Sequence, residues 1–379
     1  MATSDFAKAN IDEIVENLTT DEDVSLIAGV GFWHTHAVER LGVPAIKVSD
    51  GPNGIRGNHF FMGTPVKCLP SATALGATFD PKLIESVGLE LLAREAKLRG
   101  DAVALAPTCN IQRSPLGGRS FESFSEDPRL SGMIAAAYVK GVQSGGIATT
   151  IKHFVGNDKE NDRMAYDSIM SDRALREVYL MPFMLAQKYA QPWSFMTAYN
   201  PVNRTHVSEN PLIIQKILRE EWKFDGMVMS DCSGVYSIDH SINAGLDLDM
   251  PRTNKWRALD LVKRSIGSRK ITPRAVKPEL GNASKNAPRL VLDGDGEERT
   301  VETDEDKALI RKVAAESIVL LKNEGELLPL RPKEQGNPAV QLGGDTVEDF
   351  DKLMDQAVAV AHEADALISV VGLNADWET

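Results

Sequence analysis

The sequence has few cysteines and no excess of basic residues, and each of these two features argues against certain classes of protein. Among 379 residues only Cys68, Cys109 and Cys232 are cysteines, and they stand far apart. This number and spacing argue against a disulfide framework and a zinc site, and isolated thiols fit a cytosolic protein. Asp and Glu number 54 against 42 Lys and Arg, a net charge of −12. This acidic balance argues against nucleic acid and anionic membranes as partners.

Long apolar runs and targeting signals are also missing. No stretch of about 18 consecutive apolar residues occurs, so no membrane-spanning helix is expected. The first 26 residues read as an acidic amphipathic helix without the basic start and apolar centre of a secretory signal, which predicts a cytoplasmic location. No Gly-rich loop follows the first predicted strand, which disfavours an open nucleotide-binding sheet. His34 and His36 have no further ligand nearby, so no metal site is expected.

The sequence does contain a series of short apolar runs that end in polar residues. The clear runs cover residues 45–50, 102–106, 147–153, 193–200 and 226–231, with a weaker one at 243–249. Their lengths are typical of strands buried on both faces. Helical periodicity lies between several of them, at residues 81–99, 128–144, 172–190 and 211–222. Alternating strands and helices predict a parallel sheet, and this number of units favours a (β/α)₈ TIM-type barrel.

Polar side chains gather at the ends of these predicted strands. They are Asp50, Asn110, Lys152, His153, Tyr199, Asn200 and Asp231. Because active sites of barrel enzymes lie at the carboxyl ends of the strands, these residues are the first candidates for function.

The strongest single candidate is Asp231, at the end of Gly-Met-Val-Met-Ser-Asp. A retaining glycosidase needs such a rigidly held carboxylate as its nucleophile, although an Asp that caps a following helix fits the pattern equally well. Lys152 and His153 could bind sugar hydroxyls, but taken alone such a pair is more often structural. Arg119 follows two glycines and can point into a pocket, or belong to a surface ion-pair cluster.

The pattern changes after residue 270. Residues 1–270 form the predicted barrel domain, and residues 271–306 are rich in Pro, Gly, Asn and acidic residues, which predicts a linker. Residues 307–379 contain predicted helices at 308–321 and 347–364 and a predicted strand at 366–372. These elements are typical of an α/β sandwich but are too few to bury a core, so we expect a partial, truncated second domain.

Together the motifs resemble glycoside hydrolase family 3, in particular its yeast and fungal β-glucosidases. The matching stretches are VSDGPNGIR (48–56), NIQRSPLGGRSFESFSEDP (110–128), IKHFVGND (151–158), MTAYNPVN (196–203), GMVMSD (226–231), AGLDLDMP (244–251) and AAESIVLLKNEGELLPL (314–330). They occur in the family's order and cover most of residues 10–330.

The resemblance implies hydrolysis of terminal non-reducing β-D-glucosyl residues, in β-glucosides or cello-oligosaccharides, without metal or cofactor. Asp231 would be the nucleophile of a retaining double displacement. The residues that match the family's sugar site are Asp50, Arg119, Lys152, His153, Arg163 and Tyr199. The binding partner would be a small-molecule substrate, and the resemblance is compatible with an oligomer. Many relatives act outside the cell.

Several features depart from the family pattern. Cys232 replaces the Trp that usually follows the nucleophile, and residues 331–346 leave no room for an inserted PA14 domain. The family's acid/base Glu belongs to the second domain, and we expect its position just past Thr379, with Glu378 as the remaining candidate. The branch that uses a His instead is disfavoured, since residues 156–163 contain no His. A catalytically impaired sugar-binding relative and a β-xylosidase or other exo-glycosidase are the alternatives.

Overall fold

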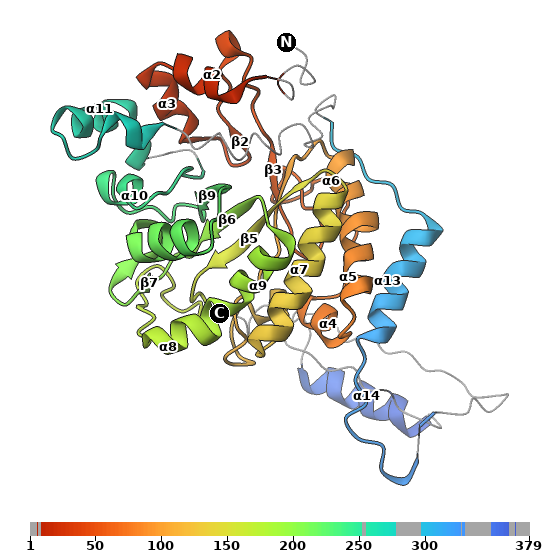
Figure 1. Cartoon of the computed structure of the whole chain (residues 1–379). Helices are drawn as coiled ribbons and strands as arrows, with labels where there is room; N and C mark the ends of the chain where they lie inside the picture. Colours follow the sequence, from red (N-terminus) through yellow and green to blue (C-terminus); the bar gives the residue numbers. More distant parts are fainter. Residues whose placement is uncertain are drawn as a thin grey trace. The chain divides into compact units, whose positions relative to one another are not determined.

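The computed structural model separates into two compact units, Met1–Ile318 and Val319–Thr379 (Figure 1). The residues that the structure describes are 6, 9–251, 255–277, 297–326, 328–329, 350–363 and 368. In the part of the chain so described, no helix is long and apolar enough to cross a membrane.

A five-stranded parallel sheet forms the centre of the first unit. Its order is β3-β4-β5-β6-β9, with bounds Val48–Asp50, Val103–Leu105, Ala148–Phe154, Ser194–Thr197 and Met227–Ser230. Almost every residue of these strands is buried, as parallel strands with covered faces require. Each of the five clear apolar runs therefore forms a strand, and the parallel sheet predicted from them is confirmed.

Single bridges continue this sheet past both edges. Beyond β9, Met229 pairs with Leu248, and Asp249 pairs with Ala28, both in parallel. Beyond β3, Lys47 pairs with His34, which lies in a small antiparallel pair of β1 (Gly29–Val30) and β2 (His34–Thr35).

The predicted run at residues 243–249 forms no regular strand, because side chains interrupt its pairing. The Asp247 carboxylate accepts the hydrogen bond of the Val228 N–H at 2.6 Å, and the Val228 carbonyl accepts from both Asp247 and Leu248. The structure thus confirms a parallel half-barrel sheet within an α/β fold, and the eight-fold barrel is not confirmed.

A long helix and its neighbour cover the β3–β5 side of the sheet (Figure 1). The first runs through α5 (Pro81–Ser86), the π-helical η2 (Val87–Ala93) and α6 (Arg94–Leu98), and the second is α7 (Pro128–Ser144). Each begins at a capping Asp followed by Pro, which fixes the first turn. Gly88 lets the two helices approach, since a Cβ there would lie 2.9 Å from the Tyr138 carbonyl oxygen.

Other helices of this unit include α2 (Ile11–Asn17), α3 (Thr20–Leu26), α4 (Ala72–Ala77), α8 (Asp172–Ala174), η4 (Leu175–Tyr179), α9 (Met181–Ala190), η6 (Leu212–Glu221), α10 (Asp239–Asn243), α11 (Leu259–Gly267) and η8 (Pro273–Val276). Phe154 packs edge to face on Phe183 and Phe195, with both ring-centroid distances 5.2 Å, and so joins sheet to helix.

The last helix of the first unit, α13 (Asp304–Glu316), ends earlier than predicted. A capping box between Thr303 and Asp306 starts it, and residues 318–321 are exposed and not helical. In the second unit, α14 covers Phe350–Glu363. The predicted strand at 366–372, apart from Ile368, and much of the predicted linker lie outside the described residues.

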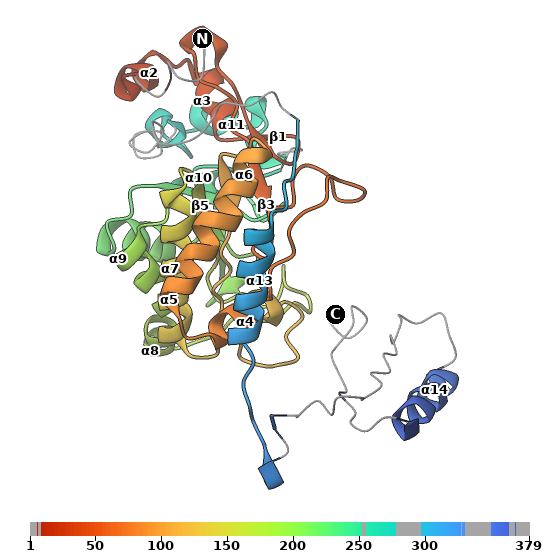
Figure 2. The ribbon, with the colours of Figure 1, turned by 90° about the vertical axis from the view of Figure 1, so that its right-hand side faces the viewer.

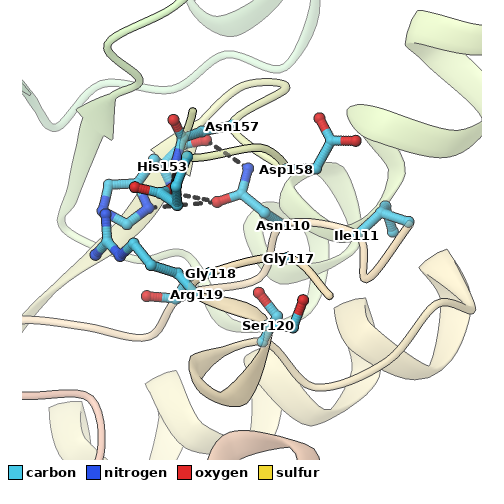
Figure 3. A pocket seen from close by; sticks show the side chains of 12 residues that line it. Asn110, Ile111, Gly117, Gly118, Arg119, Ser120, His153, Asn157 and Asp158 are labelled. Atoms are coloured by element: carbon cyan, nitrogen blue, oxygen red, sulfur yellow. Dashed lines mark hydrogen bonds between the residues drawn. The ribbon is translucent and has the colours of Figure 1, made fainter. Parts of the chain in front are cut away.

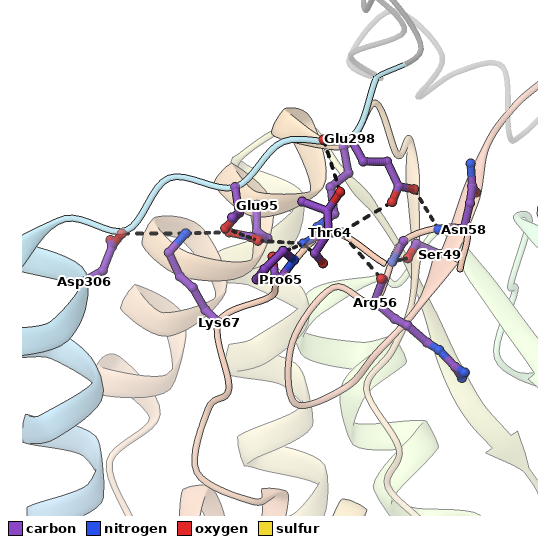
Figure 4. A network of polar contacts seen from close by, with 12 residues as sticks. Ser49, Arg56, Asn58, Thr64, Pro65, Lys67, Glu95, Glu298 and Asp306 are labelled. Atoms are coloured by element: carbon purple, nitrogen blue, oxygen red, sulfur yellow. Dashed lines mark hydrogen bonds and ion pairs between the residues drawn. The ribbon is translucent and has the colours of Figure 1, made fainter. Parts of the chain in front are cut away.

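A buried ionic network ties residues 297–306 to the sheet and to α6 (Figure 4). Glu95 accepts from Lys67 at 2.5 Å, from Arg99 at 3.2 Å and from the Thr300 hydroxyl at 2.8 Å. In addition, Lys47 bridges Glu298 at 2.9 Å and Asp101 at 3.0 Å, in the region where Figure 2 shows β3 and α6 side by side. These contacts give the last residues of the predicted linker a fixed place on the first unit.

Asp101 makes the stability of this region dependent on pH. Burial raises the pKa of Asp101 from 3.8 to about 6, against the opposing charge of Lys47. The folded state therefore binds a proton more tightly than the unfolded state, so the stabilisation is complete below the unfolded pKa and is lost as pH rises through about 6. We expect the unfolding free energy of the parent, relative to Asp101→Asn, to fall by about 2 kcal/mol from about pH 4.5 to about pH 7.5.

Urea denaturation of the parent and of Asp101→Asn at the two pH values measures this difference. A relative stability that stays constant, or rises with pH, would contradict the burial of an ionisable Asp101.

Candidate active site

Asp231 lies directly after the last residue of β9, at the carboxyl end of the sheet. Its Oδ1 accepts a hydrogen bond from the Cys232 N–H at 2.7 Å, and its backbone carbonyl accepts from the Gly234 N–H at 2.9 Å. These bonds close a turn in which Ser233 has a φ of 61°, and the next helix begins only at Asp239. Asp231 therefore does not cap a helix, and the structure removes that alternative.

His153 reaches the same carboxylate from β5. Its Nε2 lies 3.4 Å from Oδ2 of Asp231. Asn110 fixes the His153 backbone from both sides, because Oδ1 accepts from the His153 N–H and Nδ2 donates to its carbonyl, each at 2.8 Å. Figure 3 shows Arg119 and His153 together on one side of Asn110.

Asp50 and Lys152 form a close ion pair across the strand ends. They come from β3 and β5, on either side of β4. The Lys152 side chain is 3% exposed, whereas that of Asp50 is 34% exposed and so can also receive a ligand. Burial raises the pKa of Asp50, but the charge and hydrogen bond of Lys152 outweigh it, and the net pKa lies below its usual range.

Two arginines complete the ring of charges. Arg119 pairs closely with the buried Glu122, which also accepts a hydrogen bond from the Thr108 hydroxyl at 2.9 Å. Arg163 lies over the Tyr199 ring, with the guanidinium carbon 4.5 Å from the ring centroid. The Tyr199 carbonyl is fixed in turn by the Tyr236 hydroxyl at 2.9 Å.

The charges around Asp231 act in opposite directions on its protonation. Burial raises the pKa of Asp231, while Arg119, Lys152, the Cys232 N–H and the Tyr199 hydroxyl oppose that rise. Burial and the surrounding cations, Arg119 first, hold the pKa of His153 well below its usual value, so His153 is neutral near pH 7. Neutral imidazole beside a carboxylate suits hydrogen bonding to a hydroxyl group.

A small cavity adjoins this cluster. It is lined by Arg119 and His153 together with Thr108, Asn110, Ile111, Gly117, Gly118, Ser120, Ser123, Asn157, Asp158 and Glu160. Asp231 is not among the residues that line this cavity, which shares Arg119 and His153 with the cluster (Figure 3). At about 20 Å³ it has room for about one water molecule and is too small for a sugar ring.

The structure brings together every predicted site residue of the first unit. Glu378 lies outside the described residues, so its role stays a prediction. The sequence interpretation missed Glu122 and Glu160 as partners of the two arginines. The available signal was the spacing Arg119-x-x-Glu122 and Glu160-x-x-Arg163, since opposite charges three residues apart often meet in a turn.

Carboxylates, a neutral His and paired cations thus lie together at the strand ends of an α/β half-barrel, the place where barrel-type glycoside hydrolases carry their active sites. Residues 6–280 match the model of the glycosyl hydrolase family 3 N-terminal domain. The chain belongs to this family, as its motifs predicted.

Relatives and solved structures agree with this assignment. "Probable beta-glucosidase I" of Neosartorya fischeri is 49% identical over 332 residues, which cover 87% of this chain and 39% of that protein. The β-glucosidase of Kluyveromyces marxianus is 48% identical with a TM-score of 0.82, covering 86% of this chain and 41% of the other. The structure of the same enzyme in complex with glucose is 47% identical in sequence with a TM-score of 0.81, and the match covers 85% of this chain and 40% of the other. The chain thus spans about two fifths of the length of these relatives.

Proposed function

We propose that the protein hydrolyses terminal β-D-glucosyl residues of small β-glucosides and cello-oligosaccharides, with Asp231 as nucleophile. The observation that carries this proposal is the Asp231 carboxylate at the end of β9, with His153 Nε2 at 3.4 Å from its Oδ2. The β-glucosidases to which the chain is similar, one of them in complex with glucose, support glucose as the sugar.

In this mechanism the strand-end residues divide into binding and reacting groups. Asp50 accepts hydrogen bonds from sugar hydroxyls, while Lys152, His153, Arg119 and Arg163 donate them. Asp231 attacks the anomeric carbon as the bond to the aglycone breaks, and the leaving oxygen takes a proton from an acid, for which Glu378 is the proposed source. Water then cleaves the glycosyl ester, and the configuration is retained.

A catalytically impaired sugar-binding relative is the second candidate, and Cys232 favours it. The thiol is half-buried beside Asp231, and burial raises its pKa to about 11, so it stays protonated and offers no flat face for a sugar ring. Such a protein would bind glucose without turnover.

Hydrolysis of two glucosides by the purified 379-residue chain tests the proposal. One is an aryl β-glucoside with a very good leaving group, and the other is cellobiose. Turnover of both supports the full mechanism, including an acid such as Glu378. Turnover of the aryl glucoside alone supports Asp231 chemistry without that acid, because a good leaving group needs no protonation and an acid contributes about 10²–10⁴-fold for a poor one. If neither glucoside is hydrolysed, the proposed enzymatic activity is contradicted and the sugar-binding candidate remains.

A further inference from the structure

Glu160 occupies the centre of the loop that follows β5. Its Oε1 accepts a hydrogen bond from Asn157 Nδ2 at 3.0 Å, and its Oε2 accepts from Arg163 Nη1 at 2.9 Å. The Glu160 side chain is only 13% exposed, and Asn157 is 6% exposed. Both oxygens of one carboxylate are therefore engaged by residues three positions before and three positions after it, inside the same loop.

Arg163 depends on this anchor more than the other cations of the site. Its side chain is 37% exposed, against 3% for Lys152 and 26% for Arg119. The Tyr199 ring supports one face of the guanidinium at 4.5 Å, but an aromatic face sets no direction for the N–H groups. A long arginine side chain also loses considerable rotamer freedom when it is fixed in place.

We propose that Glu160 is a positioning residue, which holds the Arg163 guanidinium over Tyr199 in the orientation that a bound glucosyl unit requires. Glu160 acts through Arg163, because both of its oxygens already serve Asn157 and Arg163. The inference rests on the proposed function only in taking glucose as the sugar. It goes beyond that function by naming Glu160 as the residue that orients the Arg163 side chain.

Calorimetric titration of the full chain with D-glucose tests the inference. We expect Glu160→Ala to weaken glucose binding about tenfold, because the charge-assisted bond to Arg163 is lost. Glu160→Gln should fall between Glu160→Ala and the parent, since its amide keeps one acceptor for the two donors. If Glu160 acts through Arg163, Glu160→Ala has no further effect in the Arg163→Ala background.

Asp162→Asn is the matched control, because it removes one charge from an exposed position of the same loop. It should bind glucose as the parent does. Parent-level affinity in Glu160→Ala, or additive losses in the double variant, would overturn the inference. Should Glu160→Ala fail to fold by circular dichroism, Glu160→Gln combined with Arg163→Ala makes the same comparison.

The readout separates this inference from the proposed function. If the chain binds glucose and the Glu160 and Arg163 substitutions are non-additive, but neither glucoside is hydrolysed, only the proposed enzymatic activity is contradicted. A chain that hydrolyses the aryl glucoside while Glu160→Ala leaves glucose affinity unchanged contradicts the positioning role alone. A parent with no measurable glucose affinity contradicts the positioning role as well.

Discussion

Asp231→Asn should lower kcat/KM for an activated aryl β-glucoside by about 10⁴-fold or more, with the fold retained. The amide keeps the size of the carboxylate and its Oδ1 can still accept from the Cys232 N–H, now 2.7 Å away. A neutral amide, however, cannot form the glycosyl ester on which double displacement depends. Initial rates with the aryl glucoside measure the loss, and far-ultraviolet circular dichroism checks the fold.

Asp225→Asn is the control for this experiment. It makes the same change at an exposed residue near the start of β9, the opposite end of the strand from Asp231, and should keep parent-level turnover. Turnover near the parent level in Asp231→Asn would instead remove Asp231 as nucleophile. A slow 2-deoxy-2-fluoroglucoside gives an independent result, since its covalent label should map by mass to the peptide that contains Asp231.

The sequence predicts the strand ends of this site well, because burial leaves a strong local signal. The runs that end at Asp50, His153 and Asp231 are apolar, and each becomes a strand of the sheet. In parallel strands the carboxyl ends share one edge, so residues distant in sequence must meet there. This rule predicts that these three residues meet without knowledge of any contact, whereas Arg163 lies in a loop and is expected only from the family resemblance.

Contacts made by side chains to backbone are harder to predict. The run at 243–249 has strand-like alternation, yet the Asp247 carboxylate binds the Val228 N–H and leaves only bridges at Leu248 and Asp249. In the same way, residues 318–321 continue an apolar pattern past the end of α13 at Glu316. The first outcome does not follow from periodicity, because it depends on a partner chosen in three dimensions.

The buried network shows the same limit, since nothing in the linker sequence indicates that Thr300 and Glu298 return to α6. Thr300 donates to Glu95 at 2.8 Å, and Glu298 Oε1 accepts from the Asn58 N–H at 2.7 Å. The composition of residues 271–306 predicts a connection between domains. The structure places its last residues against the first unit, where they complete the partners of buried charges.

Glu95→Ala should destabilise the protein by about 3–5 kcal/mol. Glu95 is the shared acceptor of Lys67, Arg99 and Thr300, and the Lys67 and Arg99 side chains are 4% and 0% exposed. Without Glu95, the two buried cations keep only longer ion pairs, Lys67 to Asp306 and Arg99 to Glu298, each at 3.6 Å. Arg99 still donates to the Pro65 carbonyl at 2.6 Å, but a neutral carbonyl does not balance its charge. Removing one member of a buried ion pair costs more than the pair contributes, because the remaining charge cannot be solvated. Urea denaturation at pH 7 measures the loss.

Glu90→Ala provides the matched control, since Glu90 lies in the same long helix and is exposed. It should change stability by less than about 0.5 kcal/mol. A loss in Glu95→Ala no larger than in Glu90→Ala would mean that water reaches Lys67 and Arg99. Replacing Lys67 by Met in the Glu95→Ala background removes one of the two buried cations that have lost Glu95, so it should recover part of the loss. This recovery would separate the cost of buried charge from the cost of lost packing, which the second substitution does not restore.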